Sequence, residues 1–272
     1  MEHPDPVAGS LATADPHALL TRLRHVNLGE DGFATGVCLS EAVQEREGLL
    51  NSSLRLRYHA PDDVTAILPQ VEQRLRAGDL DLDLARDLWR VVSEPDIVAY
   101  NALRRGLLGL SLIPRPEKVE QLEFVAQVEQ APNPESRVVL TAERDALGMR
   151  RVGLDWRITD LDKRTLRRNV ELLGAELARL GLGVMRMEPW LEDPSPDWGD
   201  TPNGGFHHMG RTRMSADPRS GVVDPDCRVH GMENLYAASC AVFPTCGYIN
   251  PTFTIVALAI RLADHLKFRT AA

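Results

Sequence analysis

Apolar residues recur along the chain at two spacings, and each spacing predicts a different element. Alternating apolar positions are typical of β-strands with one buried face. The last two alternating runs flank a turn-like segment at 142–149 and predict a hairpin on a mostly antiparallel sheet. The alternating segments lie at 33–39, 54–58, 122–128, 136–141 and 150–158.

Apolar residues spaced three and four apart predict helices elsewhere. Between Pro61 and Gly106, one helical run begins near Val64, and a second begins at Asp81 and continues after a break at Pro95. No internal repeat is present, and residues 1 to about 30 show neither periodicity clearly. These patterns predict a loosely structured lead-in followed by strands and helices.

Two further helices carry start and stop signals. Thr159 and Asp162 fit a capping box. The apolar stripe of that helix is Leu166, Val170, Leu173, Leu177 and Leu180, with Gly181 as the stop. In the last helix, Asn250 is placed at the N-cap and Pro251 at the first position. Its apolar residues cover more than half of its circumference, which predicts a buried helix.

Composition narrows the classes of function. The net charge of -8 favours neither a nucleic-acid groove nor an anionic membrane surface. There is no run of about 18 apolar residues and no basic, apolar leader, so a cytoplasmic protein without a membrane partner is expected. The four cysteines form no C-x-x-C pair, and we expect free thiols and no metal site.

The stretch "NGGFHHMGRTRMS", residues 203–215, concentrates the polar chemistry of the chain. Two adjacent histidines follow a glycine-rich bend, and two arginines follow them. Taken alone, the stretch is compatible with metal ligands, a catalytic base or a polar surface loop.

Residues 207–266 hold a series of motifs in a fixed order. H-x-x-G is followed by R-M, V-V-D and R-V-x-G, and then by N-L-Y, F-P-T and N-P-T-x-T. This series resembles the C-terminal signature of the glucose–methanol–choline family of flavin oxidoreductases. The segment 129–165 is similar to the substrate-domain sheet of the family's sugar- and gluconate-dehydrogenase-like branch. The resemblance covers roughly residues 120–268 and is weak over the first hundred.

The resemblance implies an α+β fold and a division of the chain. A lead-in at 1–30 precedes a substrate-binding domain at 31–198. The segment 199–272 then corresponds to the C-terminal part of an FAD-binding, Rossmann-like domain. The implied reaction is oxidation of a small-molecule alcohol, in which a base takes the hydroxyl proton and hydride passes to flavin N5.

Individual roles follow from the same resemblance. His207 is the implied base, and a neutral imidazole suits that task. Asn250 is implied to hydrogen-bond the substrate oxygen, although helix capping alone also explains an asparagine before Pro251. The expected flavin contacts are Gly231, Asn234, Ala238, Ser239, Pro251 and Thr252. His208 is expected to be a neighbour of His207 and, with Cys246 and Tyr248, to line the substrate pocket.

The chain also departs from the family pattern. The 272 residues contain no G-x-G-x-x-G turn for the FAD pyrophosphate. Arg211 stands where threonine is usual after H-x-x-G. Ser239 and Ala241 also differ from the family's usual residues, as do Cys246, Tyr248 and Ile249. Arg213 is expected to have a structural role, and Asp224 is expected to pair with Arg228 across a loop.

These departures leave three hypotheses. The chain is the C-terminal half of a split enzyme whose partner chain supplies the Rossmann half. Alternatively, it is a non-catalytic remnant that acts as a binding or interaction module. A third possibility is a gene truncation, with the N-terminal half encoded just upstream. Under the first and third hypotheses, we expect the chain alone to bind FAD weakly or not at all.

Overall fold

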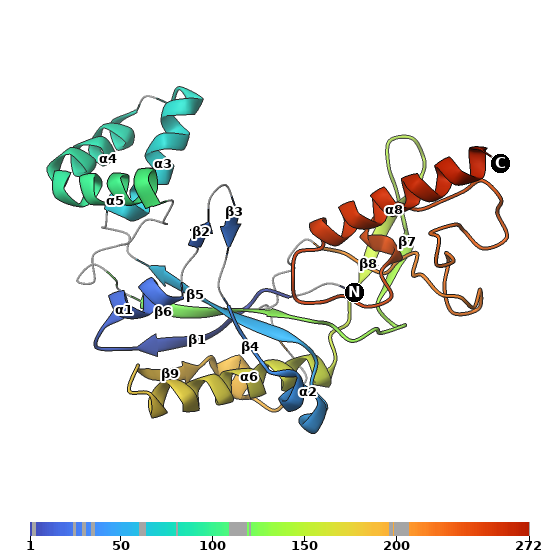
Figure 1. The fold of residues 1–272 in the computed structure, drawn as a ribbon, viewed down its shortest axis with the longest axis horizontal. Coiled ribbons are helices and arrows are strands. Elements are labelled where there is room, and N and C mark those ends of the chain that lie inside the picture. Colours follow the sequence, from blue (N-terminus) through green and yellow to red (C-terminus); the bar gives the residue numbers. More distant parts are fainter. Residues whose placement is uncertain are drawn as a thin grey trace.

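The computed structural model describes residues 1, 4–23, 26–28, 31–33, 36–59, 64–79, 81–108, 119, 121–195, 198 and 207–271. Thr35 and the glycine-rich residues 203–206, both used in the sequence predictions, lie outside this set. Within it, the predicted α+β class with a mostly antiparallel sheet is confirmed (Figure 1).

A five-stranded antiparallel sheet carries the larger core. Its strand order is β4-β5-β6-β1-β9. The alternation predicted along β6 is confirmed, because its alternate apolar residues are at most 3% exposed. The strands are β1 (Val7–Ala12), β4 (Val37–Cys38), β5 (Ser52–His59), β6 (Gln121–Val128) and β9 (Val184–Met187).

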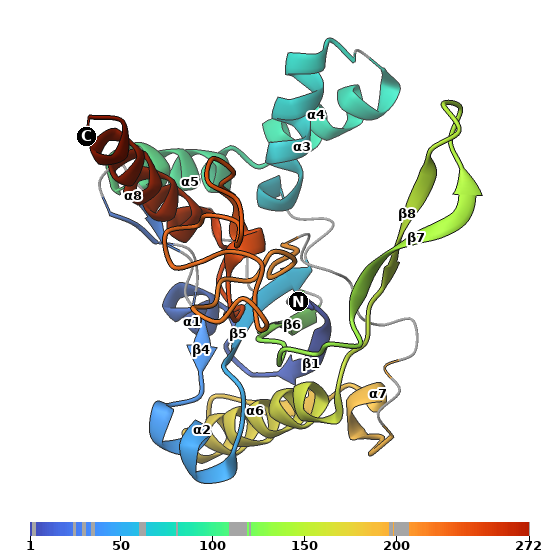
Figure 2. The same ribbon diagram turned by 90° about the vertical axis from the view of Figure 1, so that its right-hand side faces the viewer.

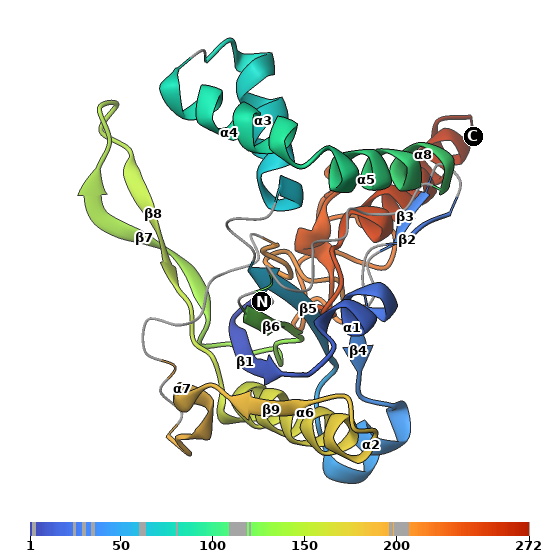
Figure 3. The same cartoon turned by 90° about the vertical axis from the view of Figure 1, so that its left-hand side faces the viewer.

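Helix α6 (Asp160–Arg179) packs against this sheet and runs along β9 (Figure 3). The predicted capping box is confirmed, since the Asp162 carboxylate accepts from the Thr159 N–H at 2.6 Å and from its hydroxyl at 2.9 Å. Gly181 follows the helix with φ +66°, a conformation that favours glycine and stops the helix. The predicted stripe is buried at Leu166, Val170, Leu173 and Leu177, whereas Leu180 is exposed.

The expectation of a loosely structured lead-in is wrong for residues 7–12, which form β1 between β6 and β9. The small residues of this segment do not give the alternating apolar pattern by which a strand is predicted. A Cβ on Gly9 would lie 2.6 Å from the Arg186 carbonyl oxygen, so the close approach of β9 requires glycine. A short helix, α1 (Pro16–Arg22), follows.

The predicted helical run between the strands is confirmed as a three-helix lobe at one end of the molecule (Figure 1). Asp81 caps the second helix, where its carboxylate accepts from the Leu84 N–H at 2.8 Å. Pro95 begins the third helix, as the predicted break required. The helices are α3 (Val64–Ala77), α4 (Leu82–Ser93) and α5 (Pro95–Leu108).

The predicted hairpin is confirmed, but its place in the fold is not the one expected. Strands β7 (Arg137–Arg144) and β8 (Arg150–Asp155) form a separate two-stranded sheet that projects from the body (Figure 2). Val138 and Leu154 are 43% and 55% exposed, so this apolar face does not join the main core. An alternating pattern of apolar residues shows that one face of a strand is apolar. It does not show which part of the fold covers that face.

Helix α8 (Thr252–Ala271) corrects the prediction of a buried C-terminal helix. Phe253 is 85% exposed and Ile260 is 59% exposed, while Leu262 is 7% exposed and packs into a second, smaller core. The Ile255 N–H donates to the Pro251 carbonyl at 2.9 Å, so the helix begins one residue later than predicted. Among the described residues, no helix has both the length and the apolar content of a membrane span.

The remaining elements are short. They are β2 (Val26–Leu28), β3 (Asp31–Phe33), α2 (Glu41–Glu47), α7 (Pro189–Glu192) and a 3-10 helix at Cys240–Val242.

An ion pair between α2 and α6 leads to a pH-dependent prediction. The Arg168 guanidinium lies 2.6 Å from the Glu47 carboxylate and lowers the pKa of Glu47 from 4.5 to about 2. Because the folded-state pKa is lowered, the pair stabilises the fold above pH 4.5 and loses this effect as the pH falls toward 2.

We therefore expect Glu47→Gln to lower the urea midpoint at pH 7 and to have a smaller effect at pH 3.5. Added salt should also reduce the difference, because both side chains are partly exposed. Denaturation curves of wild type and variant at the two pH values measure this. An equal difference at both would contradict the assignment to Glu47.

Candidate active site

The segment that begins at His207 is attached to the 3-10 helix at Cys240–Val242. Gly210, Thr212 and Met214 donate their N–H groups to the carbonyls of that helix at 3.2, 2.9 and 2.8 Å. These three hydrogen bonds fix the histidine segment against the 3-10 helix. His207 is half-buried and His208 is exposed at its start.

The loop that follows is fixed by charged side chains. The Arg213 guanidinium donates to the Ser220 carbonyl at 3.0 and 2.6 Å, which agrees with the structural role expected for this arginine. The predicted pair is confirmed too, since Arg228 Nε lies 3.2 Å from Asp224 Oδ2 and the Arg228 N–H donates to Oδ1. The second core beneath this loop is Val223, Cys227, Val242 and Leu262.

Asn250 lies at the other end of the candidate site. It is exposed and stands directly before the buried Pro251 and the first turn of α8. The first N–H groups of a helix have no partners within the helix, and the helix dipole places partial positive charge there. This turn can therefore accept a negatively charged ring edge or oxygen.

Five of the six residues predicted to contact flavin are exposed, and these five are called the shelf below. Gly231 adopts φ +77°, and a Cβ there would meet nothing within 4 Å, so space is open above it. Phe253, which follows Thr252 in the chain, is 85% exposed, and Ile249 is 62% exposed. These features fit the face of a flavin. The exposed members of the predicted set are Gly231, Asn234, Ala238, Ser239 and Thr252, whereas Pro251 is buried.

Cys246 and Tyr248, predicted to line the substrate pocket, have other surroundings. Cys246 is 3% exposed, and its thiol accepts from the Gln130 N–H at 3.2 Å and donates to the Gln130 carbonyl at 3.3 Å. The Gln130 side chain accepts from the Trp156 indole N–H at 3.1 Å. Tyr248 is half-buried beside Cys38, and burial raises its pKa. Cys246 therefore fastens the segment before Asn250 to the base of the hairpin.

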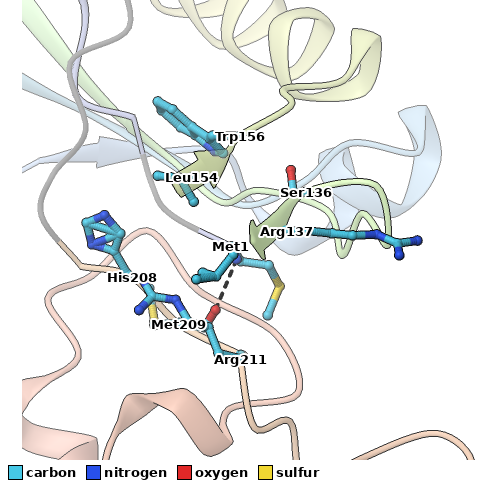
Figure 4. Close-up of a pocket in the computed structure, with 10 residues that line it drawn as sticks. Met1, Ser136, Arg137, Leu154, Trp156, His208, Met209 and Arg211 are labelled. Atoms are coloured by element: carbon cyan, nitrogen blue, oxygen red, sulfur yellow. Dashed lines mark hydrogen bonds between the residues drawn. The ribbon is translucent and has the colours of Figure 1, made fainter. Parts of the chain in front are cut away.

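His208 lines a cavity of about 520 Å³ between the histidine segment and the hairpin. His208 and Arg211 lie on one side, and Leu154 and Trp156 on the other (Figure 4). Sequence reasoning noted Arg211 only as a departure from the family and did not assign Trp156 to a site. The two segments are some fifty residues apart, and only the fold brings them together.

The buried thiol of Cys246 leads to a chemical prediction. Burial raises its pKa to about 11, so almost no thiolate forms at pH 8. We expect a thiol reagent such as DTNB to label the exposed Cys38 and the half-buried Cys240 in the native protein. Cys227 and Cys246 should react only after denaturation. Rapid native labelling that is lost in Cys246→Ala would contradict the buried placement.

Comparison with known proteins identifies the segment that carries this site. Residues 132–259 match the family model described as GMC oxidoreductase. The fructose dehydrogenase large subunit of Gluconobacter japonicus is 30% identical over 166 residues, which are 60% of this chain and 28% of that protein. The C-glycoside 3-oxidase of Arthrobacter globiformis is 36% identical over 118 residues, which are 43% of this chain and 21% of that protein.

The chain thus spans under a third of the length of the curated relatives it matches. Among solved structures, the formate oxidase of Aspergillus oryzae aligns with a TM-score of 0.49 and 17% identity. That alignment covers 99% of this chain and 46% of the oxidase.

Proposed function

Because the segment 132–259 belongs to the GMC oxidoreductase family, we propose that this chain is part of an FAD-dependent oxidoreductase. Its donor is the CH–OH group of an alcohol or a sugar-like molecule. The observation that supports this most directly is the family match itself. It spans the attached histidine segment, the exposed shelf and the first turn of α8, from His207 to Asn250 and beyond.

Each residue of the site has a task in this proposal. His207 takes the hydroxyl proton of the donor, which a neutral imidazole can do near pH 7. The Asn250 amide donates a hydrogen bond to the same oxygen and orients it. FAD, when bound, supplies the acceptor for the hydride of the alcohol carbon. Gly231 and Asn234 would be among the residues that hold it, and the first turn of α8 would stabilise negative charge placed near it.

Part of the cofactor site is proposed to come from other polypeptide. The 272 residues contain no G-x-G-x-x-G turn, and the matched segments are a minor share of the relatives' length. A helix N-terminus after such a turn is what binds a dinucleotide pyrophosphate. A Rossmann-type region, in a partner chain or in a longer form of this one, would also cover exposed apolar residues near the start of α8, such as Phe253.

The test is the visible flavin spectrum of the purified chain, with added FAD and with a co-expressed Rossmann-type region. We expect little or no flavin on the chain alone and stoichiometric flavin on the assembly. Stoichiometric flavin on the chain alone would refute the need for further polypeptide. Absence of flavin in both cases would favour a non-catalytic binding module.

Helix α8 offers a matched pair of variants for this test. Phe253 and Phe268 are 85% and 79% exposed, and about 22 Å of helix separates them. Phe253→Asp, beside the shelf, is expected to abolish flavin retention in the assembly. Phe268→Asp, at the far end of the helix, should leave it intact. Equal loss in both would point to a general effect on α8 and not to the shelf.

A further inference from the structure

Arg211 stands at the junction of two adjoining cavities. The cavity of about 520 Å³ that His208 lines shares Met1, Ser136, Gly210 and Arg211 with a neighbouring cavity of about 370 Å³. Arg211 therefore borders the same space as His208, the residue next to the proposed base His207 in the chain.

The lining of both cavities is cationic. Among the described residues that line them, three further arginines occur and no aspartate or glutamate does. This is unusual local chemistry in a chain whose net charge is -8. An anionic group would gain attraction here that the rest of the surface does not offer.

The other three arginines are already engaged. Arg213 donates to the Ser220 carbonyl, and Arg219 lies 3.0 Å from Asp217. Arg137 donates to the Pro134 carbonyl at 2.7 Å. Within the described part of the chain, no hydrogen bond or ion pair engages the Arg211 guanidinium. Among the arginines that line the cavities, Arg211 is thus the one that is available to a ligand.

We infer that Arg211 selects donors that carry an anionic group, a carboxylate or a phosphate, remote from the hydroxyl that is oxidised. A planar guanidinium binds either group through two parallel hydrogen bonds. The wall formed by Leu154 and Trp156 packs against the carbon skeleton. This inference rests on the proposed function, because it names the class of donor for the same site.

The test is direct binding to the purified chain, which requires no turnover. Calorimetric titrations compare glucose 6-phosphate and glucuronate with glucose as the neutral analogue and glucosamine as the cationic one. We expect at least one anionic sugar to bind roughly tenfold or more tightly than glucose. The two anionic arms distinguish phosphate from carboxylate. Glucosamine should bind no better than glucose.

Variants assign the effect to one guanidinium. Arg211→Gln is expected to remove the preference for the anion, and Arg211→Lys to retain part of it. Arg219→Gln is the matched control, because Arg219 borders the second cavity but is paired with Asp217. The indole N–H signal of Trp156, assigned with Trp156→Phe, should shift when the anion binds if the ligand is in this cavity.

Three results would overturn the inference. They are equal affinity for charged and neutral sugars, no measurable binding of any of them, or an anion preference that survives Arg211→Gln. None of these depends on flavin. Failure of the flavin test with anion selectivity intact would instead remove the proposed oxidation while leaving the anion site in place.

Discussion

Replacing His207 with alanine in the flavin-loaded assembly is expected to lower kcat for alcohol oxidation by about 10²–10⁴-fold. The imidazole is the group proposed to take the hydroxyl proton, so the variant lacks the proposed base. KM should change little, because the imidazole contributes to the transition state more than to donor binding. Stopped-flow reduction of the bound flavin by the donor measures the step directly.

The control for this prediction is the adjacent histidine. His208→Ala removes an exposed ring that lines the cavity, so it should alter KM and leave the rate of flavin reduction within about tenfold of wild type. The flavin content of both variants must equal that of wild type. A reduction rate in His207→Ala that matches wild type across the pH range would exclude His207 as the base.

The elements that sequence predicted best are those whose signals are local. Helix α6 begins where Thr159 and Asp162 form a capping box and ends before Gly181, and each of these signals acts within one turn of the helix. Strand β6 carries alternate apolar residues because one of its faces is buried in the core that it shares with α6. Neither prediction required knowledge of a distant segment.

The errors arose where a distant segment decides the outcome. Strand β1 exists because β6 and β9 pair with its backbone, and its small residues, such as Gly9, carry no strong strand signal. Helix α8 has the composition of a buried helix, but the described residues cover only the side that contains Leu262. The composition of a helix shows that much of its surface is apolar. It does not show whether the residues that cover this surface belong to the same chain.

In the candidate site, too, some features could be predicted from local sequence and others depend on distant segments. The order of motifs from His207 to Asn250 can be read from the sequence alone. The structure adds that the segment after His207 is attached to the 3-10 helix at Cys240–Val242. The cavity wall at Trp156 and the anchor between Cys246 and Gln130 depend on the hairpin's position. No spacing in the sequence encodes that position, so these residues emerge only from the fold.

The largest expected effect on stability is at the centre of the sheet. Phe124 on β6 is 0% exposed and belongs to the core that α6 covers. Phe124→Ala is expected to lower the free energy of unfolding by about 3–5 kcal/mol, because it removes buried apolar surface and leaves a cavity. Since natural domains are stable by only about 5–15 kcal/mol, the variant should unfold at much lower denaturant concentration.

Phe268→Ala is the control for Phe124→Ala, because it makes the same change at an exposed position. Phe268 is 79% exposed on α8, so its removal should change the free energy of unfolding by less than about 0.5 kcal/mol. Urea denaturation followed by circular dichroism measures both variants under one set of conditions. Similar midpoints for the two variants would mean that Phe124 is not the centre of the core. A large loss in Phe268→Ala alone would mean that other polypeptide already covers α8 in the purified protein.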